Sequence, residues 1–521
     1  ENMKLERTKN ASRNIFFGII LKMYQILIPF LMRTAMIYFM GVEYLGLNSL
    51  FSSVLQVLNL AELGVGSAMV YSMYKPIAED DTEAICGLEK LYRKYYNWIG
   101  FVIAVIGGIC TPFIPKLISG DVPSDINIYI LYLLNLAATV LTYWLFSYKN
   151  SLFLAHQRND VTSKITLLTN TFQYLMQLMV LWLFHNYYFY VIIMLLSQTM
   201  TNILTAVYAD KIYPNYKPKG ELSKKTVKEI NRRIKDLFTA KLGATIVNSA
   251  DTIVISAFLG LTVLAIYQNY YFIMTSVSAI ITIILNSFLA GIGNSMVTES
   301  IEKNYRDFKK IVFIINWIVN FCICCFACLY QPFIRLWVGK KYLFEYTVVI
   351  LFCVYFYLVI MQQVIGVYKD AAGIWHQDRF RPLIASIVNL VLNLLFVRKF
   401  GIYAIILSTI ISYIVVAMPW MISNVFRYVF KRSWKEYVKI LFFDASVCIG
   451  ITIICVIVCN SIKISNLYIK IVINVIVCGI LSNILLWIIN KNNLYYNDML
   501  DYLNKFSRNK LQKLFIVLKT K

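Results

Sequence analysis

The chain has 521 residues, a formal net charge of +23, a mean hydropathy of +0.65, and 59% hydrophobic but only 15% charged residues. Because soluble proteins carry about 25% charged residues, this composition excludes an ordinary soluble protein. It indicates an all-α polytopic membrane protein, in which each crossing satisfies its own backbone hydrogen bonds as a helix.

Apolar runs of about 20 residues, the length that crosses a bilayer, predict about fourteen transmembrane helices. They lie at 14–39, 45–73, 95–117, 126–148, 164–184, 187–208, 234–259, 263–297, 310–338, 346–369, 382–399, 401–427, 438–460 and 466–490. If the N-terminus is cytoplasmic, about 39 of the 50 Lys and Arg residues fall in the inner segments. The positive-inside rule then predicts that both termini are cytoplasmic, and the charge needs no nucleic-acid partner to explain it.

The first expected helix, 14–39, carries two cations within its apolar run. Lys22 and Arg33 are eleven residues apart, which places them within about 20° of one face and about 16 Å apart along the axis. One interpretation is a cationic face that binds an anion. The other is that Arg33 extends to the outer interface and Lys22 to the inner one.

The second expected helix, 45–73, has a polar stripe of Asn48, Ser52, Asn59 and Glu62. Such a stripe faces protein or water and not lipid. Glu62 is therefore a candidate for charge balance or ion coupling, or for a structural pair with a basic residue of a neighbouring helix.

A weak internal repeat connects this region to the second half of the chain. Residues 41–47 resemble 260–266, at an offset of 219 (260 − 41), and 64–70 resemble 291–297, at an offset of 227 (291 − 64). A repeat within a membrane chain suggests a transporter built from two halves.

The longest inner loop, 210–235, contains nine basic residues and divides the repeat. Six is an even number of crossings, so both lobes enter the membrane from the same side and form a parallel repeat. The expected domains are an N-terminal six-helix lobe at 1–209, a basic cytoplasmic linker at 210–235, a C-terminal six-helix lobe at 236–430, two extra helices at 431–490, and a basic amphipathic cytoplasmic tail at 491–521.

The expected helix 234–259 repeats the pattern of the first, with Lys241 and Asn248 on one face and Asp251 beside it. A lysine in the middle of a membrane helix is costly, so Lys241 is a candidate anion ligand, although extension to the interface is the alternative. Asp251 lies about 15 Å further along the helix, so the two charges need partners from other helices.

Several site types are missing from the chain. Cys322, Cys324, Cys325 and Cys328 lie in one apolar run without an accompanying His or acid, so they are interpreted as packing residues and no metal site is expected. There is no glycine-rich phosphate loop and no room for a soluble catalytic domain. We therefore expect a transporter, not an enzyme, with no cofactor.

Two stretches resemble the Wzx-type oligosaccharide flippases, of the superfamily that also contains the lipid II flippase and the multidrug and toxin extruders. They are 8–23 with 33–81, which include the runs Tyr-Leu-Gly-Leu and Ala-Glu-Leu-Gly, and 248–272. The resemblance implies two lobes that rock between inward-open and outward-open states. It also implies a sugar repeat unit on a polyprenyl (undecaprenyl) pyrophosphate as substrate, moved to the outer leaflet of a bacterial cytoplasmic membrane for capsule or similar polysaccharide assembly.

By location and charge, the resemblance assigns substrate binding to Lys22, Arg33 and Lys241, and the polar stripes add Asn48 and Asn248. Glu62 and Asp251 would balance these cations or bind a coupling H⁺ or Na⁺. The implied partners are the lipid-linked oligosaccharide, membrane lipids and, as a further candidate, polysaccharide polymerase machinery.

The charge of the substrate agrees with this hypothesis. A pyrophosphate crossing about 30 Å of hydrocarbon needs a hydrated cationic cavity to offset its desolvation. Two alternatives stay open: a cation-coupled multidrug extruder of the same fold, which would favour acids in its cavity, and a polysaccharide polymerase or acyltransferase, which would need a larger outer loop.

Overall fold

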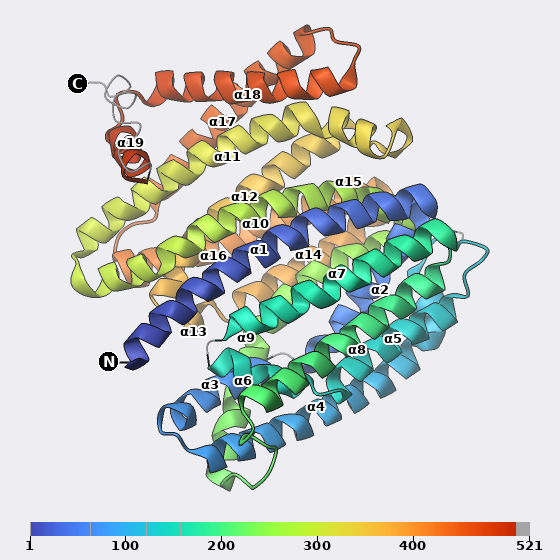
Figure 1. The fold of residues 1–521 in the computed structure, drawn as a ribbon. Coiled ribbons are helices and arrows are strands. Elements are labelled where there is room, and N and C mark those ends of the chain that lie inside the picture. Colours follow the sequence, from blue (N-terminus) through green and yellow to red (C-terminus); the bar gives the residue numbers. More distant parts are fainter. Residues whose placement is uncertain (1, 63, 121, 157, 507–521) are drawn as a thin grey trace. The chain divides into compact units, whose positions relative to one another are not determined.

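A computed structural model describes residues 2–62, 64–120, 122–156 and 158–506, without the side chains of 2–19, 61, 236, 239–241, 244, 247, 248, 290 and 501–506. Over these ranges the chain folds into helices and contains no β-strand (Figure 1). Ten of the helices are long and apolar enough to cross a membrane, or eleven when a bent pair counts as one span. The expectation of an all-α polytopic membrane fold is therefore confirmed.

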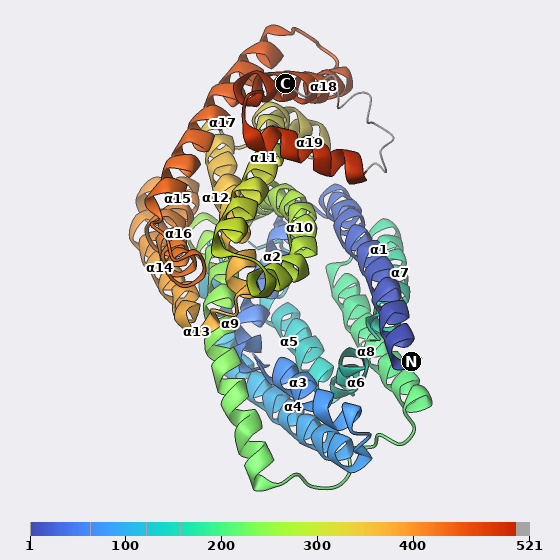
Figure 2. The same cartoon turned by 90° about the vertical axis from the view of Figure 1, so that its left-hand side faces the viewer.

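The contacts divide the chain into two compact units. Unit 1 comprises residues 1–268 and 393–402, and unit 2 comprises 269–392 and 403–521. The helices of unit 1 are α1 (Asn2–Phe39), α2 (Val42–Leu58), α3 (Val65–Ala78), α4 (Thr82–Cys110), α5 (Ile128–Trp144), α6 (Asn150–Ala155), α7 (Asn159–Leu183), α8 (Tyr187–Ile212) and α9 (Lys224–Leu259), with short 3₁₀ helices at Asn59–Glu62, Thr111–Leu117 and Ser147–Lys149. Within this unit α1 runs along α7, and α7 packs against α8 (Figure 2).

Two helices have parts in both units: α10 (Leu261–Thr298) and α14 (Arg381–Phe400). The other helices belong to unit 2. They are α11 (Ile301–Trp337), α12 (Tyr346–Ala371), α13 (Trp375–Asp378), α15 (Ile402–Ser412), α16 (Met418–Val425), α17 (Lys435–Ser461), α18 (Leu467–Asn490) and α19 (Leu494–Phe506), with a 3₁₀ helix at Lys340–Tyr342 and π-helical turns at Tyr413–Ala417 and Phe426–Phe430. Residue 402 alone of α15 is assigned to unit 1.

The expected helix 45–73 is interrupted. After α2 a 3₁₀ turn covers Asn59–Glu62, and α3 begins after Gly64, whose φ is +90°. A Cβ at Gly64 would also lie 2.9 Å from the carbonyl oxygen of Ile234 on α9. Both the left-handed backbone and the close approach of α9 therefore require glycine here, and this break places Glu62 in an irregular segment.

The first part of the internal repeat has a common backbone conformation. Gly41 (φ 117°, ψ 167°) precedes α2, and Gly260 (φ 90°, ψ 173°) precedes α10. The second part differs, because the helix breaks at Gly64 but α10 continues through Gly291 to Thr298. The two matched sequences therefore share a helix start but not a helix break.

The tail helix α19 packs on protein. Its residues Tyr496, Met499 and Leu500 are buried against side chains of α11 and α18, including Trp317. A salt bridge of 2.9 Å between Lys310 and Asp498 adds to this contact. The later part of the basic amphipathic tail, residues 507–521, lies outside the described residues.

Candidate functional site

A chain of side chains in unit 1 connects two of the residues that the sequence singles out. Arg33 on α1 is half-buried, and its guanidinium lies in the neighbourhood of the Tyr190 side chain on α8. Tyr190 stacks on Tyr187 with ring centroids 5.7 Å apart and an interplanar angle of 11°. The Tyr187 hydroxyl donates to Oδ1 of Asn48 at 3.4 Å. Arg33 and Asn48 thus lie at the two ends of one tyrosine stack.

The start of α8 positions these two tyrosines. The side chain of Asn186 caps the helix by accepting a hydrogen bond from the backbone N–H of Phe189 at 3.1 Å, which fixes the first turn. Tyr187 and Tyr190 are three residues apart and so share a helix face. The sequence analysis did not single them out, although an asparagine cap followed by Tyr-Tyr-Phe-Tyr was a usable signal.

A second aromatic contact extends this stack. The ring of Tyr44 on α2 lies 5.4 Å from that of Tyr187, and its hydroxyl donates to Asp125. The group offers a cation, several hydroxyls, an amide and flat aromatic faces. Arginine is well suited to bind phosphate oxygens. The hydroxyl groups and apolar faces of a sugar ring can contact the tyrosine hydroxyls and rings, so this set of side chains suits a phosphorylated glycan.

Of the other candidate anion ligands, Lys22, Lys241 and Asn248, the structure describes the side chain of Lys22 alone. Lys22 is half-buried on α1, about 16 Å along the helix from Arg33, and forms no ion pair with any described residue. The backbone places Lys241 and Asn248 on α9, but their side chains lie outside the described residues. Convergence of the three cations therefore stays a prediction.

Glu62 is bonded to tyrosine. Tyr96 of α4 donates to Oε1 of Glu62 at 2.9 Å, and Tyr92 donates to the Tyr96 hydroxyl at 2.7 Å. A Cβ on Gly66 would lie 2.9 Å from the Tyr92 hydroxyl oxygen, so the glycine leaves room for this chain. Hydroxyl donors stabilise an ionised carboxylate. The sequence suggested a basic residue as the partner of Glu62, and these tyrosine partners were not predicted.

Asp251 is held by an amide from a distant helix. Asn393 of α14 donates to Oδ1 of Asp251 at 2.7 Å, and both side chains are buried. Nearby on α9, Thr252 accepts from Gln268 at 3.0 Å, and Ser249 donates to Gln56 of α2 at 3.0 Å. A buried carboxylate beside a neutral amide is a candidate site for a proton or a small monovalent cation.

A polar cluster secures the loop between α6 and α7. The ring of His156 stacks on Tyr213 at 4.3 Å, and burial lowers the pKa of His156. A hydrogen bond of 2.9 Å to the buried Asp160 raises the pKa of Arg158. Unit 2 has a related loop, where Arg381 donates to Asp378 at 2.7 Å. His376 lies 220 residues after His156 (376 − 156), close to the first offset of the repeat.

Buried thiols gather between α11, α17 and α18. The Sγ atoms of Cys328, Cys459 and Cys478 all lie within 4.8 Å of one another. The expectation from the sequence concerned only the four cysteines of one helix, and this convergence of three helices was not predicted. The cluster packs in an apolar core with Leu486 and Ile451, and the expectation that the chain has no metal site stays a prediction.

Comparisons with known proteins agree with a transporter fold. The family model described as "Polysaccharide biosynthesis protein" matches residues 11–289. No curated protein matches the chain. The structure of a lipid II flippase MurJ in an inward closed conformation is similar, with a TM-score of 0.65, 14% identity, and coverage of 92% of this chain and 99% of that chain.

Multidrug resistance transporters of the MATE family share the fold as well. An inward-facing structure from the MOP superfamily has a TM-score of 0.59 and 13% identity, and the match covers 78% of this chain and 97% of that chain. An outward-facing structure has a TM-score of 0.51 and 14% identity, with coverage of 82% and 97%. At these identities the comparisons establish the fold of a multi-pass membrane transporter.

Proposed function

The chain belongs to the polysaccharide biosynthesis protein family, and from this premise we propose that it is a Wzx-type flippase. It moves polyprenyl-pyrophosphate-linked oligosaccharide repeat units from the cytoplasmic to the outer leaflet of a bacterial cell membrane by alternating access. Both termini lie in the cytoplasm, and the product feeds surface polysaccharide synthesis, with polymerase machinery as the partner that uses it.

The observation that carries this proposal is the group formed by Arg33, Tyr190, Tyr187 and Asn48. A cation within an expected membrane span is costly unless it serves a partner or a ligand, and a pyrophosphate supplies the complementary charge. The neighbouring tyrosine faces and the Asn48 amide suit the sugar that follows it. Lys22 and Lys241 supply further charge along the path, and Asn248 a further amide.

Glu62 and Asp251 balance charge or couple transport to an ion in this proposal. Asp251, with its amide donor Asn393, and Glu62, with its tyrosine donors, hold negative charge near the cationic path. They balance Lys22, Arg33 and Lys241 when no substrate is bound, or bind the H⁺ or Na⁺ that drives the cycle. In this proposal no step needs a resident cofactor, and the protein catalyses no covalent reaction.

Reconstitution tests the proposal. Purified protein in liposomes is supplied with a fluorescent polyprenyl-pyrophosphate oligosaccharide on one leaflet, and its arrival on the other is measured for wild type, Arg33→Ala and the control Arg335→Ala. Arg335 is an exposed arginine of α11, so it matches the change in residue type.

Arg33→Ala loses one charge-assisted contact worth about 1.5–3 kcal/mol, so its transfer rate should be about tenfold or more below that of wild type. The control Arg335→Ala should retain activity. Equal activity of all three proteins would overturn the role of Arg33. A wild type that moves no lipid-linked glycan would overturn the function itself.

A further inference from the structure

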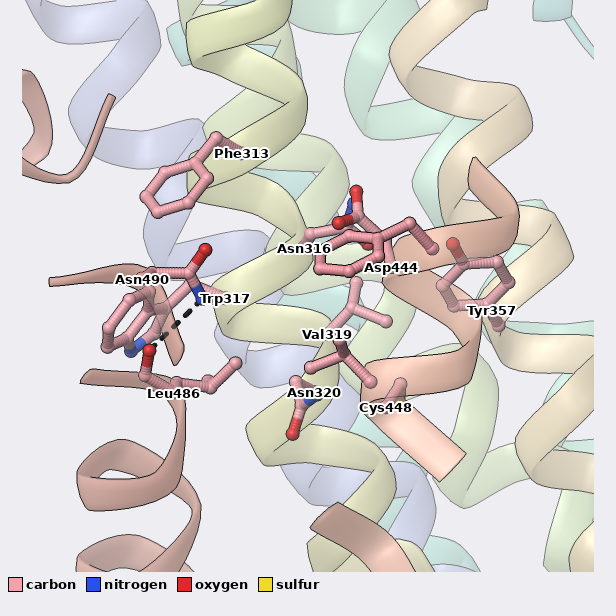
Figure 3. A pocket seen from close by; sticks show the side chains of 12 residues that line it. Phe313, Asn316, Trp317, Val319, Asn320, Tyr357, Asp444, Cys448, Leu486 and Asn490 are labelled. Carbon is pink, nitrogen blue, oxygen red and sulfur yellow. Dashed lines mark hydrogen bonds between the residues drawn. The ribbon is translucent and has the colours of Figure 1, made fainter. Parts of the chain in front are cut away.

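A pocket in unit 2 lies between α11, α12, α17 and α18 (Figure 3). Its polar lining comprises Asn316 and Asn320 of α11, Tyr357 of α12, Asp444 of α17 and Asn490 of α18. None of these residues belongs to the groups around Arg33, Glu62 or Asp251. Two of the four helices, α17 and α18, lie beyond the internal repeat, so the transport hypothesis assigns them no task.

Asp444 is the acid of this pocket. It lies in α17, one of the helices apolar enough to span a membrane, and it comes five residues, or about 7.5 Å, after Lys439. Nδ2 of Asn316 donates a hydrogen bond to its Oδ2, and Figure 3 shows the two side chains meeting between α11 and α17. Among the described residues, no basic side chain forms an ion pair with Asp444.

A carboxylate in such a position is expensive to leave charged and unpaired, because neither lipid nor an apolar helix surface replaces its hydration. One neutral amide donor offsets only part of that cost. A singly charged cation neutralises the group, whereas a divalent ion would leave an excess positive charge in the same apolar surroundings. Apart from the thiol of Cys448, the side-chain ligands of the pocket are oxygens, which suit a proton or Na⁺ better than a soft metal ion.

We propose that Asp444 and Asn316 form a monovalent-cation site, at which Asp444 takes up a proton or Na⁺. The hydroxyl of Tyr357 donates to the backbone carbonyl of Leu441 at 3.2 Å, so its oxygen still has a lone pair for the ion. Asn320 lies one helical turn after Asn316 and lines the same pocket. An ion bound there stabilises the contact of α17 with α11. The packing of the two extra helices, α17 and α18, therefore depends on the concentration of that ion.

This inference does not depend on the glycan hypothesis, so it is tested on purified protein without a lipid-linked substrate. Two readouts are compared in wild type, Asp444→Asn and Asn316→Leu. The first is the infrared absorption of a protonated carboxyl group at neutral pH. The second is the midpoint of thermal unfolding when NaCl replaces choline chloride at constant ionic strength. Asp160→Asn is the matched control, because it removes a buried carboxylate elsewhere in the chain that is paired with Arg158.

A proton site predicts a component of the protonated-carboxyl band in wild type that Asp444→Asn lacks and Asp160→Asn retains, with no effect of Na⁺ on the midpoint. A Na⁺ site predicts that Na⁺ raises the midpoint of wild type and of Asp160→Asn. In that case Asp444→Asn loses this rise entirely and Asn316→Leu loses part of it.

Asp444→Asn keeps the shape of the side chain and removes a charge, so the variant should fold. The proposal is overturned if wild type has neither signal, or if the signals persist unchanged in Asp444→Asn. An equal loss of signal in Asp160→Asn and in Asp444→Asn would also overturn it, because the signals would then not be specific to this pocket.

Discussion

Replacing Gly46 by alanine tests the packing on which the Tyr-Leu-Gly-Leu run depends. Gly46 lies in α2, where a Cβ would come within 2.4 Å of the carbonyl oxygen, 3.0 Å of the carbonyl carbon and 3.1 Å of the Cα of Leu261, the first residue of α10. Ordinary contact begins at 3.4 Å, so the two backbones must separate by 1.0 Å (3.4 − 2.4). No side-chain rotation relieves this overlap, because the atoms belong to the main chain.

The expected cost follows from two opposing effects. Overpacking of a close contact costs about 1–3 kcal/mol, and a clash with backbone belongs at the upper end of that range. Alanine recovers about 1 kcal/mol over glycine inside a helix, so Gly46→Ala should destabilise unit 1 by about 2 kcal/mol. The control is Gly108→Ala in α4, where a Cβ meets nothing within 4 Å, and which should gain about 1 kcal/mol.

The assay is thermal unfolding in detergent, followed by tryptophan fluorescence at one scan rate, because unfolding of a large membrane protein is usually irreversible. The midpoint should fall for Gly46→Ala and rise for Gly108→Ala. The same direction of change in both variants, or an unchanged midpoint for Gly46→Ala, would refute the close approach of α2 and α10 described here.

Two further predictions concern polar groups. Asn393→Leu removes the 2.7 Å hydrogen bond to the buried Asp251, so it should lower the free energy of unfolding by about 1.5–3 kcal/mol. Adding Asp251→Asn to this variant should recover part of the loss. Strictly additive effects of the two substitutions in this double-mutant cycle would argue against the bond. Burial lowers the pKa of His156, so the folded state favours the neutral ring. The folded protein therefore has its full stability above about pH 6.5 and loses part of it as the pH falls below that value. His156→Phe keeps an aromatic ring beside Tyr213 and should therefore lose less stability than wild type on acidification; an equal loss in both proteins would contradict this expectation.

The membrane fold could be predicted because it depends on local properties. The length and apolarity of each run determine where a helix can cross, and each of the fourteen predicted segments overlaps at least one α-helix among the described residues. The break between Leu58 and Val65 escaped prediction, because hydropathy does not distinguish a continuous helix from one interrupted by a 3₁₀ turn. The left-handed backbone of Gly64 and the tight approach of α9, which together require glycine there, become visible only in the structure.

The partners of the candidate site residues could not be predicted, since they come from distant parts of the chain. Tyr190 lies 157 residues after Arg33 (190 − 33), and Asn393 lies 142 residues from Asp251. Asp444 received no attention in the sequence, because a single acid in a long apolar run has no local pattern. Its amide partner Asn316 is 128 residues away, and only the packing of α17 on α11 brings the two together.

The most direct test of the central claim compares substrate classes in one preparation of wild-type vesicles. Movement between leaflets is measured for a fluorescent polyprenyl-pyrophosphate oligosaccharide, and export is measured for a fluorescent organic cation under imposed H⁺ and Na⁺ gradients. The flippase account predicts transfer of the lipid-linked glycan well above protein-free vesicles, with no export of the organic cation. Export of the cation without any transfer of the glycan would contradict it and would establish a multidrug extruder of the same fold.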